Sequence, residues 1–235
     1  MKAEEILRGV FETFDEGILQ RLYKAASVDD ARVLADFAAA GHVLPEIKAL
    51  QSVDVQIIDP IVDRYIRNAR RSAAVSGASL GIGGWVGVPP GLLHMMVVLI
   101  RLAQRTSLAY GFDYRTPREE VELWKTLALA VDANLEWDGK DADVLRRLPA
   151  VFRGSTTFAN PLLAKAFRAV AQRVASLAGR RVSRLLPVLG GGTGLVLNYL
   201  EVDRVGRRMK SAFRSRHAVQ GFDSSTAVEV EVLNG

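Results

Sequence analysis

The chain has 235 residues, of which 49% are hydrophobic and 24% charged, and its formal net charge is +5. The hydrophobic fraction is too high for a disordered chain. The absence of cysteine excludes disulfides, thiolate metal sites and cysteine nucleophiles.

Capping signals predict three helices in the first half of the chain. Residues 27–30 predict a helix start, because a side-chain oxygen there can accept hydrogen bonds from the first helical amides, and Gly41 predicts its end. A second helix is expected from Pro60 toward Gly84. The ring of Pro90 suits the first turn of a third helix, which we expect to end at residue 111.

Three further helices are expected in the second half. Thr116 and Pro117 combine a capping residue with a proline at the first helical position, and they predict a helix to about residue 134. Asn160 and Pro161 repeat this signal for a helix to about residue 184, and a last helix is expected over 194–217.

The end of the chain follows a different pattern. Residues 227–233 alternate between apolar and polar side chains, which predicts a short strand; the alternative is a flexible tail over 218–235. The sequence as a whole therefore predicts an all-α fold, a multi-helix bundle forming a single domain over residues 1–217.

Two stretches of the chain contain no Asp, Glu, Lys or Arg. Residues 72–100 are numerous enough to cross a bilayer, but seven glycines and prolines between residues 81 and 91 divide them into two pieces. This segment predicts a helical hairpin that either enters one leaflet or is buried in a soluble core. The second stretch, residues 185–200, is too short to span a membrane unaided.

Small residues recur every four positions in and beside these stretches. This spacing predicts two close helix–helix crossings, because small side chains let two backbones approach. Such crossings occur both in membranes and in soluble bundles, so the pattern does not distinguish helices surrounded by lipid from helices in a water-soluble protein. The helix-packing positions are Ala69, Ala73, Gly77 and Gly81 at the first crossing, and Gly190 and Gly194 at the second.

The excess positive charge lies near the C-terminus. Residues 148–220 hold 13 basic and two acidic side chains, a net charge of +11, and arginine clusters flank the second uncharged stretch. Apolar segments beside arginine clusters are typical of surfaces that bind anionic lipid, and a solvated basic face is the alternative interpretation. The lipid-binding residues predicted from this pattern are Trp85, Leu92, Leu93, Met95, Met96, Arg180, Arg181, Arg184, Arg204, Arg207 and Arg208.

Nucleic acid is a less favoured partner, because the chain has no zinc-ligand spacing and no base-reading pattern on a recognition helix. No metal site is expected either, since His42, His94 and His217 stand far apart, and no cofactor is expected. We interpret His94, which lies within an apolar helix, as a hydrogen-bonded core residue.

One motif points to an enzyme. Residues 77–81 match the Gly-x-Ser-x-Gly elbow of serine hydrolases, with Ser79 as the candidate nucleophile. The elbow requires a strand before the serine, whereas residues 67–75 predict a helix. A hydrolase is therefore the least favoured of the functions considered.

Four segments resemble the EcsC family: Ser79-Leu-Gly-Ile-Gly-Gly, Pro89-Pro90, Ala109-Tyr-Gly-Phe-Asp113 and Leu186-Pro-Val-Leu-Gly-Gly-Gly. The resemblance covers about residues 64–216, and Gly91 departs from the acidic residue that the family typically has after its proline. It implies a mostly helical, bacterial, membrane-associated protein of unestablished activity, encoded near an ABC-type exporter in some bacteria.

These observations favour a peripheral membrane protein that binds anionic lipids and is accessory to an ABC-type transport system. Acidic residues interrupt any apolar stretch near the N-terminus, so we expect the protein on the cytoplasmic face of the inner membrane. The alternatives are a soluble protein that binds a lipid or another apolar ligand and, second, a serine hydrolase.

Overall fold

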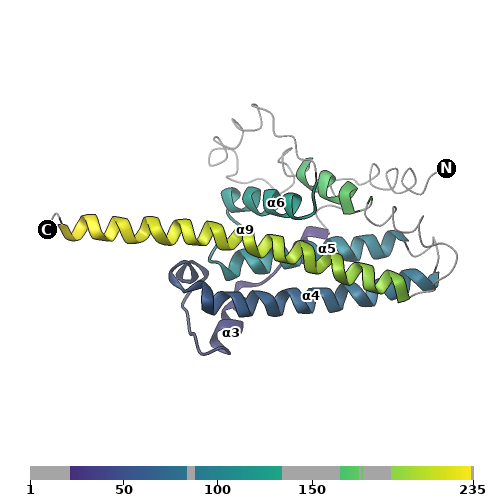
Figure 1. Ribbon diagram of the computed structural model, residues 1–235, viewed down its shortest axis with the longest axis horizontal. Coiled ribbons are helices and arrows are strands. Elements are labelled where there is room, and N and C mark those ends of the chain that lie inside the picture. The colour runs from purple at the N-terminus through teal and green to yellow at the C-terminus, as the bar shows by residue number, and fades with distance from the viewer. Residues whose placement is uncertain (1–21, 84–87, 134–164, 175, 177–191, 234–235) are drawn as a thin grey trace.

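A computed structural model describes residues 22–83, 88–133, 165–174, 176 and 192–233 (Figure 1). Every secondary-structure element in these ranges is helical, which confirms the all-α prediction. The elements in chain order are helical residues 22–26, α3 (Asp30–Ala38), η1 (Ile47–Ser52), α4 (Val55–Gly83), α5 (Val88–Ala109), α6 (Pro117–Ala130), helical residues 165–174 and α9 (Gly192–Leu233).

Three long helices form the centre of the bundle. Helix α4 runs antiparallel to both α5 and α9 (Figure 1). All three helices meet at Gly206 of α9, where a Cβ atom would lie 2.9 Å from Ile66 Cγ1 on α4 and 3.2 Å from Leu102 Cδ2 on α5. Glycine therefore allows α9 to lie close to both of its neighbours.

Shorter elements cover this centre. Helix α6 packs on the helical residues 165–174, where the rings of Trp124 and Phe167 meet edge to face at 5.4 Å. Both rings are fully buried. From α9, the guanidinium of Arg216 lies 4.2 Å from the Phe112 ring centre and forms two hydrogen bonds to the Glu119 carboxylate, at 2.7 and 3.0 Å. Arg216 thus joins α9 to the start of α6.

The helix boundaries follow the capping chemistry, and several are shifted from the sequence prediction. Asp29 caps α3 through a 3.0 Å hydrogen bond from the Ala31 amide. Helix α4 begins at Val55 instead of Pro60, because the Asp54 carboxylate accepts the Gln56 amide at 2.7 Å and supplies an earlier cap. Helix α6 ends at Ala130, short of residue 134, because Asp132 adopts a positive φ of 56°.

The predicted C-terminal strand over residues 227–233 is wrong: this segment continues α9 to Leu233. Alternation alone does not make a strand, because a strand needs a neighbouring strand to pair its backbone groups. The described part of the chain offers no such neighbour, whereas a helix pairs its backbone groups internally. Within the described residues, no helix is both long and apolar enough to cross a membrane.

Candidate functional site

The structure brings three uncharged helix segments to the same end of the bundle. Residues 72–83 of α4, 88–100 of α5 and 192–200 of α9 contain no Asp, Glu, Lys or Arg, and these segments meet at one end (Figure 1). Two contacts set the register: Arg70 Nη1 lies 2.6 Å from Asp203 Oδ1, and Ser72 Oγ lies 3.3 Å from His94 Nε2. We call the three segments together the charge-free end.

The described side chains of this end are partly buried and partly exposed. Met95 and Met96 are buried in the core and Leu93 packs against it, whereas the side chain of Leu200 is 57% exposed. His94 is exposed and hydrogen-bonded to Ser72, so the interpretation as a core residue is wrong. Of the predicted lipid-binding residues, Trp85, Arg180, Arg181 and Arg184 lie outside the described residues, as does the side chain of Leu92.

Two of the predicted helix-packing positions, both on α4, have described side chains. Ala73 is fully buried, and Ala69 packs against the core. The backbone is helical at Gly77, Gly81 and Gly194, whereas Gly190 lies outside the described residues. Ser79 also lies inside α4, so its backbone does not form the strand-to-helix turn that the hydrolase elbow requires.

The described part of the C-terminal basic region is largely engaged with acids and carbonyls of the fold. Arg207 Nε lies 2.9 Å from Asp203 Oδ2, on the carboxylate that also binds Arg70. Arg208 donates to the Ala130 carbonyl at 3.1 Å and lies 2.7 Å from Asp132, so a cation stands at the C-terminal end of α6. The hydrogen bond from Arg208 holds the pKa of Asp132 below its ordinary value.

Other members of the basic region bind α4. Lys210 Nζ lies 2.8 Å from Asp63 Oδ1 and 3.6 Å from Asp59 Oδ2, and Arg214 Nε lies 3.5 Å from the same Asp59 oxygen. The Tyr110 hydroxyl donates to Asp59 Oδ1 at 2.6 Å, and burial together with this bond raises the pKa of the phenol. Lys210 and Arg214 thus hold α9 to α4, just as Arg208, one of the predicted lipid-binding residues, holds α9 to the end of α6.

Exposed arginines remain next to the charge-free end. Arg204 and Arg207 on α9 have side chains 63% and 70% exposed, although each also lies near an acid of its own helix. Arg67 and Arg71 on α4 and Arg101 on α5 are exposed as well. We call these five residues the basic collar, because they follow the uncharged segments within about two helical turns on all three helices.

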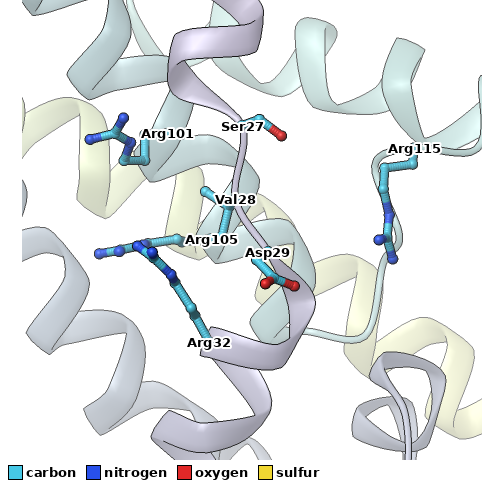
Figure 2. A pocket seen from close by; sticks show the side chains of 7 residues that line it. All are labelled: Ser27, Val28, Asp29, Arg32, Arg101, Arg105 and Arg115. Carbon is cyan, nitrogen blue, oxygen red and sulfur yellow. The ribbon is translucent and has the colours of Figure 1, made fainter.

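A cavity of about 430 Å³ lies beside α5, between the start of α3 and the loop before α6 (Figure 2). In Figure 2 the side chains of Arg32, Arg101 and Arg105 extend to one side of the segment 27–29, and Arg115 lies on the other side. The residues that line this cavity are Ser27, Val28, Asp29, Arg32, Arg101, Arg105 and Arg115.

Sequence reasoning did not find this cavity, because its residues come from three segments up to 88 positions apart. The one available signal was the pair Arg101 and Arg105, which stand one turn apart directly after the uncharged stretch of α5. Helical spacing predicts that they share a face, but only the fold brings Arg32 to that face.

A buried polar cluster lies between α5 and α6. Glu120 is 5% exposed, and burial raises the pKa of its carboxyl to about 8, against the opposing effect of a hydrogen bond from Tyr23. Gln104 on α5 is fully buried as well. Within the described ranges, no group of three or more His, Asp or Glu side chains could hold a metal ion.

Fold and charge pattern together define the class of protein: an all-helical bundle with one uncharged end and exposed arginines behind it. The model of the EcsC protein family matches residues 3–217, so the chain belongs to the EcsC family. The segments that carry the sequence resemblance all lie inside the matched range. No curated protein and no solved structure shows significant similarity to the chain.

Proposed function

We propose that this EcsC protein is a peripheral membrane protein whose charge-free end enters one leaflet of an anionic membrane. The observation that carries the proposal is the meeting of three uncharged helix segments at one end of the bundle. An apolar end assembled from three helices presents a larger surface to lipid than any one segment alone.

The dimensions of this end suit a single leaflet. The 12 residues 72–83 of α4 rise about 18 Å, and half of a bilayer's hydrocarbon core is about 15 Å thick. Away from the last turn of α4 and the first turns of α5 and α9, backbone groups in these segments are paired within helices, so this part would enter lipid without losing hydrogen bonds.

The basic collar supports binding to anionic lipid in particular. Its arginines stand just behind the uncharged segments, at the level where phosphate head groups would lie if those segments were immersed. Each basic side chain near an anionic surface contributes about 1 kcal/mol. Two expectations belong to this same proposal: a location on the cytoplasmic face of the inner membrane, and the role beside an ABC-type transporter that the family resemblance implies.

A matched pair of variants on α9 tests the proposal. Leu200→Glu places a charge on an exposed residue of the charge-free end, and Val219→Glu makes the same kind of change on a 63% exposed residue 19 positions along the same helix. We expect Leu200→Glu to weaken flotation of the purified full chain with phosphatidylglycerol vesicles by at least about tenfold, because a carboxylate is costly in the acyl region. Val219→Glu should bind as the wild type does.

Lipid composition and salt provide the second measurement. Binding should fall when phosphatidylglycerol is replaced by phosphatidylcholine, and high salt should weaken it, because salt screens the exposed arginines. A wild-type chain that stays unbound at low salt, or equal losses in the two variants, would contradict the proposal. If the protein does not bind vesicles but carries lipid after purification without detergent, the alternative of a soluble lipid-binding protein would be favoured instead.

A further inference from the structure

The arginine-lined cavity carries more positive charge than its surroundings neutralise. We propose that it is a binding site for a phosphate group, held by Arg32, Arg101 and Arg105. This inference goes beyond membrane association, since the cavity would take such an anion whether or not the charge-free end enters lipid.

Two of the charged residues around the cavity are already engaged. Arg115 lies 2.7 Å from Asp113 and 3.0 Å from Asp30, and its hydrogen bonds hold the pKa of Asp30 below the ordinary value. The Asp29 carboxylate accepts the Ala31 amide as the cap of α3. By contrast, no ion pair involves Arg32, Arg101 or Arg105 in the part of the chain that the structure describes. Three cations around one cavity repel one another, and an anion between them would remove that repulsion.

Two of these guanidinium groups are held in place from behind. Arg105 lies over the ring of Tyr65, at 5.4 Å from its centre. The Tyr65 hydroxyl donates to Asp36 at 2.8 Å, and Asp36 also binds Arg64 at 3.0 Å, so the ring beneath Arg105 is fixed. Arg101 donates one hydrogen bond to the Ala25 carbonyl, which leaves its other N–H groups available. Groups fixed in advance lose less conformational entropy when they bind a ligand.

The chemistry of the cavity selects the class of ligand. Guanidinium forks match pairs of phosphate oxygens, and a phosphate offers enough oxygens to meet several arginines at once, whereas a carboxylate offers two. Arg32 and Arg101 are exposed, so an anion can reach them from solvent. The volume of about 430 Å³ leaves room for an organic group attached to the phosphate. A phosphate monoester therefore fits best, either as a free metabolite or as a lipid head group.

Calorimetry on the purified full chain tests the site, with inorganic phosphate and glycerol 3-phosphate as probes. We expect saturable binding that Arg105→Gln and Arg32→Gln each weaken by at least about tenfold, because each removes a charged hydrogen-bonding group. Arg118→Gln is the matched control: Arg118 is exposed and lies outside the cavity, and its loss should change affinity less than about twofold. Arg105→Lys keeps the charge without the planar guanidinium, and its affinity for the probes should lie between those of the wild type and Arg105→Gln.

Absence of saturable binding to both probes would overturn the proposal, as would equal losses in the Arg32, Arg105 and Arg118 variants. Since Arg32 is exposed on α3, Arg32→Gln remains informative even if an Arg105 variant unfolds, which thermal melting would reveal. Vesicles containing phosphatidic acid distinguish the two sources of phosphate. If Arg32→Gln weakens binding to them, the phosphate comes from a lipid head group; if only the soluble probes respond, the ligand is a free phosphate monoester. Leu200→Glu should leave glycerol 3-phosphate binding unchanged, which separates this site from the proposed membrane association.

Discussion

The charge-free end and the rest of the bundle use the same three helices but are held together differently. Beyond residue 71 of α4 there is no charged side chain to pair, whereas toward its start Arg70, Asp63 and Asp59 all bind α9. We call the part that contains these contacts the charged body. Ion pairs need correct partners at fixed positions, so the body defines most of the register, and the charge-free end adds the contact between Ser72 and His94.

The largest expected effect comes from breaking the charged body at a turn. Gly111 has a φ of +83°, and a Cβ there would lie 2.7 Å from the backbone nitrogen of Gln51. We expect Gly111→Ala to lower the free energy of unfolding by about 3–5 kcal/mol, because backbone strain and a clash with main-chain atoms combine. Urea unfolding followed by circular dichroism measures this loss.

Gly41 provides the matched control for this prediction. It has a φ of +90°, but a Cβ there would meet nothing within 4 Å. Gly41→Ala should therefore cost only the backbone strain, about 1 kcal/mol. Equal losses in the two variants would show that the contact with Gln51 does not constrain the fold.

A smaller loss is expected where the charged body depends on one acid. Asp59→Ala would remove the acceptor of the Tyr110 hydroxyl and the shared carboxylate of Lys210 and Arg214, at a cost of about 2–3 kcal/mol. Asp63, one turn away, has a 45% exposed side chain and binds Lys210 alone, so Asp63→Ala should cost less than about 1 kcal/mol. Thermal melts of both variants at the same salt concentration compare them, and a reversed order would contradict this assignment.

The smallest effect concerns the buried carboxyl of Glu120 and depends on pH. Its pKa is about 8 in the fold against 4.5 for the free group, so the unfolded chain loses the proton first and folding becomes less favourable as pH rises from about 4.5 to 8. Glu120→Gln removes this dependence. We expect the variant to be more stable than the wild type by on the order of 1–2 kcal/mol at pH 8, after the cost of burying extra amide donors. Below pH 4.5, where the wild-type carboxyl is protonated in both states, only that cost remains and the variant should be the less stable of the two.

Denaturant titrations across this pH range measure the difference between the two chains, which cancels the contribution of other titrating groups. A difference that stays constant with pH would show that Glu120 is ionised in the fold. The variants at Gly111, Asp59 and Glu120 should leave the vesicle binding of the folded protein unchanged, because none of these residues lies in the charge-free end.

Local chemistry made much of the fold predictable. As expected, Asp29 caps the start of α3, Gly41 follows its end with a positive φ, and Pro117 is the first residue of α6. Thr116 occupies the predicted cap position, but its hydroxyl bonds to the Asp113 carbonyl instead of capping α6. Such details depend on the loop before the helix, which has no periodic signal in the sequence.

The candidate sites were predictable only where their residues are consecutive in the sequence. The uncharged stretches are visible as runs of residues, but their meeting at one end follows from the antiparallel packing of α4, α5 and α9. The basic region was visible too, yet its pairing with Asp59, Asp132 and Glu119 requires knowledge of acids more than 70 residues away. No sequence pattern indicated the whole cavity, because Arg32 and Arg105 come together only through tertiary contacts.

Helix α9 is the longest element that the structure describes, and its length has a mechanical consequence. Its 42 residues measure about 63 Å against about 44 Å for the 29 residues of α4, so the helix projects past its neighbours (Figure 1). Starting a helix is costly, whereas adding residues to an existing one costs little. The turns of α9 that bury Val202, Val205, Met209 and Phe213 in the bundle therefore support the overhanging turns, and loosening these packed turns would shorten the overhang at a distance.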